Sequence, residues 1–213
     1  MSEFLSRLTR SPLAFDAAPA AEIATLFADQ PAPLRELLAG TAGCSPFLKS
    51  VMEREAEWLR GALAGPPEAA FDALMAALVP EAPAATGSLL RQGKRRIALL
   101  AALADLGGVW SLEEVTTALT RFADRAVQRA FATHLAEEIR RKKIPGAEPG
   151  EEERGAGMVA FAMGKMGAFE LNYSSDIDLI CLFDESQFDP DDALEARQAF
   201  IRATRKAAAM LND

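Results

Sequence analysis

The pattern of apolar residues changes near residue 150, and this change limits the folds that the chain can adopt. Before it, apolar residues recur mostly every three or four positions, in segments that proline and glycine separate. That spacing predicts helices, each with one buried face. After it, the apolar residues come in short unbroken runs, which predict strands. We therefore predict an α+β fold with a mostly helical amino-terminal region.

The helical region is predicted to extend over residues 1–143. Two helix starts carry clear signals, because Ser45 can act as a cap and Ser111 forms a capping box with Glu114. A single charged residue, Glu55, interrupts the apolar face of the third helix. Helices are expected at residues 20–29, 33–40, 46–64, 67–79, 88–106 and 111–143.

Proline and glycine cluster in residues 144–156, which we interpret as a linker. A second, incomplete α/β domain is predicted over residues 157–213. Apolar runs predict strands at residues 158–163 and 177–183, the first of them buried on both faces. Helical periodicity resumes over residues 191–211.

The segment between the two predicted strands carries two acidic residues, Asp176 and Asp178. Side chains alternate along a strand, so these carboxylates are expected on one face with their Cα atoms about 6.6 Å apart. Magnesium is typically held by one or two carboxylates together with substrate phosphates and water. The pair therefore predicts half of a magnesium site. The alternative at this point is that one aspartate starts a strand and the other is an exposed strand residue.

Other residues of the same segment suit an anionic ligand. Gly164 and Gly167 allow backbone N–H groups to approach a phosphate closely. Ser174 and Ser175 can add hydroxyl donors, and Lys165 can add a mobile positive charge. Phosphate chemistry is therefore the use that this combination favours.

Charge and hydropathy exclude several other classes of function. The chain has 23 Lys+Arg and 31 Asp+Glu, a formal net charge of -8, so general attraction to nucleic acid or anionic lipid is not expected. No run of about 18 apolar residues predicts a membrane span. No signal peptide is evident either. The expected location is the cytoplasm.

The run from Gly164 to Ile180 resembles the active-site entry of the DNA polymerase beta-type nucleotidyltransferases. The sequence of this run is more similar still to the glutamine synthetase adenylyltransferase family, whose members have two such domains. The heptapeptide that begins at Asn172 favours the amino-terminal, adenylyl-removing half. Residues 91–96 and 104–110 also resemble that family, so the likeness covers most of residues 45–213.

This resemblance implies a phosphorolysis in which phosphate attacks the AMP phosphorus of adenylylated glutamine synthetase and releases ADP. Asp176 and Asp178 would hold Mg²⁺, while Gly164 and Ser175 would cradle phosphate. Lys165 would be a further contact, at a place where many relatives carry serine. The implied partners are glutamine synthetase, a PII-type signalling protein, phosphate, and the nucleotides AMP, ADP and ATP.

The resemblance also implies a third carboxylate on a later strand, for which this sequence has no match. Asp184 and Glu185 are poor substitutes, because they lie past the end of the second predicted strand. We therefore expect a truncated polypeptide with little activity of its own. Two alternatives stay open: a non-catalytic scaffold that docks glutamine synthetase or a PII-type protein, and a nucleotidyltransferase for another acceptor, such as an antibiotic.

Overall fold

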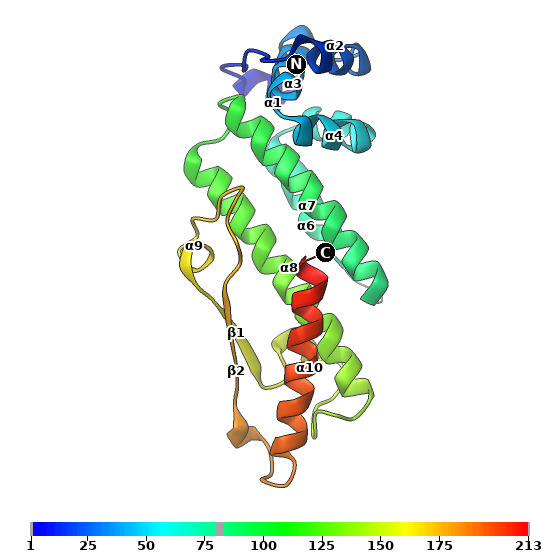
Figure 1. The fold of residues 1–213 in the computed structure, drawn as a ribbon, viewed down its shortest axis with the longest axis vertical. Helices are drawn as coiled ribbons and strands as arrows, with labels where there is room; N and C mark the ends of the chain where they lie inside the picture. Colours follow the sequence, from blue (N-terminus) through cyan, green and yellow to red (C-terminus); the bar gives the residue numbers. More distant parts are fainter. Residues whose placement is uncertain (1, 80–82, 213) are drawn as a thin grey trace. The chain divides into compact units, whose positions relative to one another are not determined.

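The computed structural model describes residues 2–79 and 83–212. The α-helices are α1 (Glu3–Arg7), α2 (Ala17–Leu26), α3 (Ala32–Cys44), α4 (Pro46–Arg54), α5 (Ala56–Leu63), α6 (Pro67–Ala76), α7 (Pro83–Leu106), α8 (Leu112–Arg140), α9 (Gly164–Gly167) and α10 (Ala193–Asn212). Two short 3₁₀ helices, η1 (Glu151–Arg154) and η2 (Glu185–Gln187), flank two strands, β1 (Met158–Ala162) and β2 (Leu179–Phe183). Helices dominate, as Figure 1 shows, and the predicted α+β class is confirmed.

The chain forms two compact units. The first comprises residues 1–77 and 93–119, and the second comprises residues 78–92 and 120–213. Helices α7 and α8 each contribute residues to both units. In the part of the chain that the structure describes, no helix is both long and apolar enough to cross a membrane.

In the first unit, the helix predicted over residues 46–64 is divided in two. Helix α4 ends at Arg54 and α5 begins at Ala56, with Glu55 between them. The Glu55 side chain is 5% exposed and accepts hydrogen bonds from Arg95 (Nε to Oε1, 3.1 Å) and Arg96 (Nε to Oε2, 2.8 Å). Buried carboxylates need such partners, which explains why a charged residue lies on this otherwise apolar face.

The predicted helix starts are confirmed. The Ser45 hydroxyl accepts a hydrogen bond from the Leu48 N–H (3.2 Å) and caps α4. At the start of α8, the Glu114 N–H donates to the Ser111 hydroxyl, and the Ser111 N–H donates back to the Glu114 carboxylate (2.6 Å). Two backbone donors at a helix end are thereby satisfied at once.

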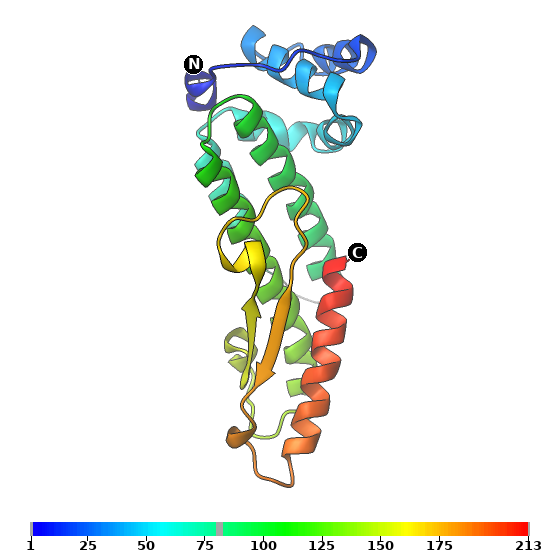
Figure 2. The same ribbon diagram turned by 60° about the vertical axis from the view of Figure 1, so that its left-hand side comes forward.

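In the second unit, β1 and β2 pair in antiparallel orientation. The register joins Met158 to Phe183 at one end and Ala162 to Leu179 at the other. Helix α10 contacts β2 and lies beside the sheet in both views of Figures 1 and 2. A cluster of three rings connects the sheet to the helix, with the Phe183 and Phe200 ring centroids 5.4 Å apart. Phe188 contacts both rings.

Ion pairs join α10 to the carboxyl-terminal part of α8. Glu138 of α8 is 1% exposed and accepts hydrogen bonds from Arg202 of α10, the shorter at 2.7 Å. One turn further along α10, Lys206 donates to Glu137 at 2.9 Å. The Lys206 ammonium holds the pKa of the Glu137 carboxyl below its usual value. Two ion pairs one helical turn apart therefore hold the two helices together.

The prediction that residues 158–163 form a strand buried on both faces is wrong. Burial alternates along β1 and β2, so only one face of the sheet is covered. The other face is apolar and largely exposed, with Phe161 at 50% and Ile180 at 48%. An unbroken apolar run fits burial on both faces, but α10 covers only one side of this pair of strands.

We predict that Glu55→Gln lowers the free energy of unfolding by about 1–3 kcal/mol, because Arg95 and Arg96 lose their shared buried partner. The loss should stay at this level because both guanidinium groups reach solvent. The matched control is Glu57→Gln, since the Glu57 side chain is 95% exposed and its one ion-pair partner among the described residues is Arg60. That change should cost less than about 0.5 kcal/mol. Chemical denaturation measures both, and equal costs would contradict the assignment.

Candidate functional site

The connection between β1 and β2 begins with a glycine turn. Gly164 starts the short helix α9 at a φ of +55°, a left-handed value that side chains rarely adopt. At Gly167, an added Cβ would collide with the carbonyl oxygen of Ala162. The turn therefore needs glycine at both positions, for backbone conformation at one and for space at the other. Lys165, between them, is exposed.

The polar part of the connection is organised by Asn172. Its side-chain Oδ1 accepts hydrogen bonds from the Ser175 hydroxyl (2.7 Å), the Ser174 N–H (3.1 Å) and the Ser174 hydroxyl (3.3 Å). In return, the Asn172 N–H donates to the Ser175 hydroxyl oxygen (3.2 Å). Both serine hydroxyls predicted to contact phosphate are thus fixed in a compact turn directly before Asp176. An asparagine followed by serines is a turn signal in the sequence, and it was the clue that could have revealed this role.

The two aspartates lie just before β2 and not within it, which corrects the predicted strand at residues 177–183. Strand β2 begins at Leu179, and both Asp176 and Asp178 belong to the exposed, non-helical approach to it. The carbonyl of Asp178 accepts a hydrogen bond from the Met163 N–H (2.9 Å). Backbone hydrogen bonding between the two segments therefore continues one residue beyond the ends of the strands. The later start follows from the pairing, because the partner strand β1 ends at Ala162 and the chain turns into α9 at Gly164.

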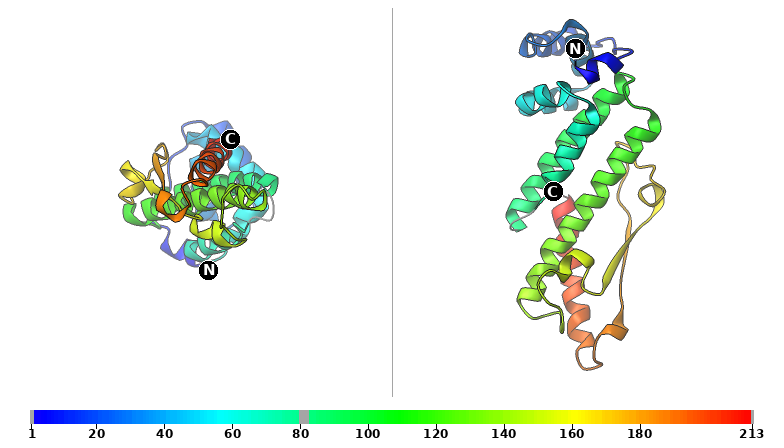
Figure 3. Two further views of the ribbon diagram at one scale, coloured as in Figure 1. Left: turned by 90° about the horizontal axis from the view of Figure 1, so that it is seen from below. Right: turned by 180° about the vertical axis from the view of Figure 1, so that it is seen from behind.

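All six predicted site residues lie in this one connection, at the end of the sheet where Ala162 pairs with Leu179. The Met163 to Asp178 hydrogen bond brings the glycine turn and the second aspartate to the same end. Asp178 is exposed and lies two residues before Ile180, so it continues the exposed positions of β2. The connection runs beside α8, as the rear view in Figure 3 shows. The predicted site residues are Gly164, Lys165, Ser174, Ser175, Asp176 and Asp178.

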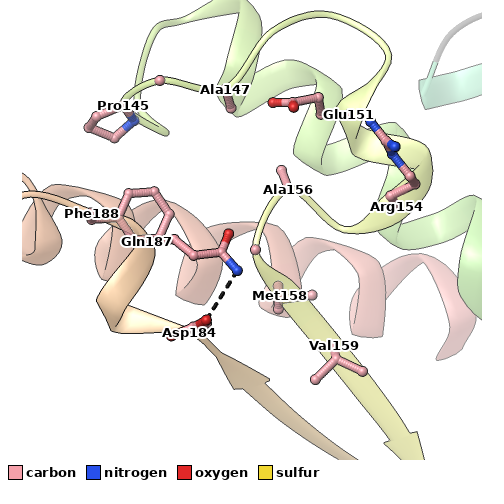
Figure 4. Close-up of a pocket in the computed structure, with 12 residues that line it drawn as sticks. Pro145, Ala147, Glu151, Arg154, Ala156, Met158, Val159, Asp184, Gln187 and Phe188 are labelled. Carbon is pink, nitrogen blue, oxygen red and sulfur yellow. Dashed lines mark hydrogen bonds between the residues drawn. The ribbon is translucent and has the colours of Figure 1, made fainter.

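A cavity of about 560 Å³ lies at the opposite end of the sheet, next to Met158. Figure 4 shows the side chains around it, including Gln187, which donates to Asp184 at 3.1 Å. Hydrogen bonds from Ser186 and Gln187 keep the pKa of the Asp184 carboxyl below its usual value. None of the six predicted site residues is among the described residues that line this cavity. The cavity is therefore separate from the predicted site.

Comparison with known proteins identifies the family. A model of the family described as glutamate-ammonia ligase adenylyltransferase matches residues 35–213. The chain belongs to this family. The match confirms the family that the sequence of the connection indicated.

The glutamate-ammonia ligase adenylyltransferase relatives are bacterial proteins. One from a Bradyrhizobium species (strain BTAi1) is 41% identical over 184 residues, which are 84% of this chain and 19% of the relative. Another, from Bradyrhizobium diazoefficiens, is 41% identical over 188 residues, covering 84% of this chain and 18% of the relative. A third, from Xanthobacter autotrophicus, is 37% identical over 185 residues, with the same coverage of 84% and 18%.

Each of these relatives is named bifunctional glutamine synthetase adenylyltransferase/adenylyl-removing enzyme. The chain spans about a fifth of the length of the curated relatives it matches. No solved structure matches it.

The donor chemistry of the connection fits a magnesium ion. Asp176 and Asp178 offer hard carboxylate oxygens at the exposed end of the sheet, where water and phosphate oxygens can complete the coordination. Within residues 2–79 and 83–212, no group of three or more histidine, cysteine or acidic residues gathers as a metal site. The two aspartates alone would thus suit a cation that keeps several non-protein ligands, as magnesium does.

We predict that Gly167→Ala lowers the free energy of unfolding by about 1–3 kcal/mol, because the new methyl group must displace the Ala162 carbonyl. The control is Gly61→Ala in α5, where an added Cβ meets nothing within 4 Å. That change should stabilise the chain by about 0.5–1 kcal/mol, the usual gain of alanine over glycine in a helix. Urea denaturation compares the two variants. A neutral Gly167→Ala would contradict the tight turn.

Proposed function

We propose that this chain carries the adenylyl-removing site of its family, which removes AMP from adenylylated glutamine synthetase by phosphorolysis. Residues 157–213 are the nucleotidyltransferase part of this proposal, residues 1–143 are a helical region, and residues 144–156 link them. The observation that carries the proposal is the Met163 to Asp178 hydrogen bond, which brings a glycine turn and an acidic pair to one end of the sheet. The names of the relatives, which include adenylyl removal, support it.

In this proposal, Asp176 and Asp178 would hold Mg²⁺, which neutralises charge on the phosphoryl oxygens. The exposed backbone at Gly164 and the side chain of Lys165 face solvent, where they can bind the incoming phosphate. An oxygen of that phosphate forms the new bond to the AMP phosphorus as the bond to the tyrosine oxygen breaks. The products are ADP and the free tyrosine side chain of glutamine synthetase.

The serines contribute through the turn that they form. Ser175 donates to Asn172 at 2.7 Å, so its hydroxyl must exchange this partner to donate to phosphate. Its oxygen also accepts from the Asn172 N–H. We infer that the main contribution of Ser174 and Ser175 is to hold the backbone that leads into Asp176.

We predict that Asp176→Asn or Asp178→Asn reduces AMP release by about a thousandfold, since several kcal/mol of charge stabilisation are lost. The assay uses a chimera in which this chain replaces the matching segment of a full-length relative, with adenylylated glutamine synthetase, phosphate and magnesium. Glu185→Gln is the matched control, because this exposed carboxylate lies beyond the far end of β2. It should leave the rate unchanged. Full activity in either aspartate variant would reject the proposed site.

A second candidate function, a scaffold that docks glutamine synthetase or a PII-type protein, is favoured by one feature of the first unit. Leu13 and Phe15 are 92% and 94% exposed. The extended segment that carries them lies tightly on α3, where a Cβ at Gly40 would collide with the Pro12 carbonyl and one at Gly43 with Ala14. Two apolar side chains are thereby held outward on a fixed backbone.

For the scaffold function, we predict that Leu13→Ser combined with Phe15→Ser weakens binding to glutamine synthetase by about tenfold, because exposed apolar anchors commonly dominate interfaces. Surface plasmon resonance with the 213-residue chain measures the affinity. Asp178→Asn should bind as the wild type does. Unchanged binding in the double variant would remove the support that this segment gives to the scaffold function.

A further inference from the structure

The connection between the strands is mostly exposed, but two of its side chains are buried. Met166 is 2% exposed and Leu171 is 7% exposed, whereas the residues that follow, including Asn172, face solvent. The backbone at Leu171 is also held. Its N–H donates a hydrogen bond to the hydroxyl of Thr120 on α8, at 3.3 Å. Leu171 is therefore a point where the connection is attached to α8.

Thr120 is an unusual residue for its position. It is completely buried, at 0% exposure, and Ala123 and Val127, which lie on the same face of α8, are buried too. A hydroxyl in such surroundings is costly unless it forms hydrogen bonds. The bond to Leu171, 51 residues later, gives this hydroxyl a use that valine, which has the same shape, cannot fulfil.

The attachment directly precedes the turn that leads to the acidic pair. Leu171 is followed by Asn172, whose side chain holds Ser174 and Ser175, and Asp176 comes next. If the Thr120 acceptor were absent, the Leu171 N–H would be buried and unpaired, which costs about 1–3 kcal/mol. The backbone would relieve this cost by moving toward water, and the turn after it would move as well.

We propose that Thr120 is a positioning residue for the acidic site, acting through the Leu171 N–H to fix the turn that presents Asp176. This inference rests on the proposed function. It assigns a role to a residue that lies outside the connection and contacts neither phosphate nor metal ion.

The test compares Thr120→Val, which removes the acceptor but keeps the shape, with Thr120→Ser, which keeps the acceptor. Two readouts are taken on the 213-residue chain: amide hydrogen exchange at Leu171, and the Mn²⁺ concentration that half-broadens the amide NMR signals of residues 174–178. Thr120→Val should speed exchange about tenfold. It should also raise the Mn²⁺ concentration about tenfold, as the loss of a group that orients a metal ligand commonly does. Thr120→Ser should restore both values.

The matched control is Thr41→Val. Thr41 is a buried threonine of the first unit whose hydroxyl has no hydrogen-bond partner among the described residues. This change removes a hydroxyl without removing a bond, so neither readout should change. Should Thr120→Val fail to fold, Thr120→Ala removes the same acceptor with less crowding, and its readouts replace those of the valine variant.

The outcomes separate this inference from the proposed function. Faster exchange at Leu171 with unchanged Mn²⁺ binding would overturn the positioning role and leave Thr120 as a purely structural contact. Failure of Thr120→Ser to restore the values would also overturn it. If Asp178→Asn leaves the Mn²⁺ response of the chain unchanged, the proposed metal site itself is wrong. An absence of any Mn²⁺ response in the wild type would reject both.

Discussion

The antiparallel pairing of β1 with β2 is the interaction on which the arrangement of the site depends. Its register joins Ala162 to Leu179 and continues into the hydrogen bond between Met163 and Asp178. A slip of one residue would turn every side chain of β2 to the other face. Asp178 would then point toward the covered side of the sheet. The apolar runs thus have a second role besides burial. By setting the register of the two strands, they determine which residues lie next to each other at the end of the sheet.

Features set by neighbouring residues were predictable from the sequence. The capping box of Ser111 with Glu114 is an example, because the two residues that form it are three positions apart. The break between α4 and α5 at Glu55 was not predictable. Its partners Arg95 and Arg96 follow about 40 positions later, and no local sequence pattern indicates that they pair with Glu55. The open face of the sheet was missed for a related reason. A run of apolar residues says that burial is favourable, but it does not say how many layers pack on the strands.

The same distinction applies to the site. Its six predicted residues are close together because they are close in sequence, so one contiguous motif was enough to find them. The late start of β2 follows from the end of its partner strand at Ala162, and the apolar pattern of residues 177–183 carries no information about where that partner ends. Thr120 lies 51 residues before its partner Leu171, on a helix whose pattern would accept valine equally well. Its contribution comes from the tertiary structure alone.

The contact among Phe183, Phe188 and Phe200 has a consequence for how the sheet and α10 unfold. A two-stranded sheet is marginally stable by itself in water, and here much of its support comes from rings shared with α10. Strands and helix should accordingly melt as a single cooperative unit. A partner that bound only α10 would, through this coupling, also change the stability of the connection between β1 and β2, which it does not contact.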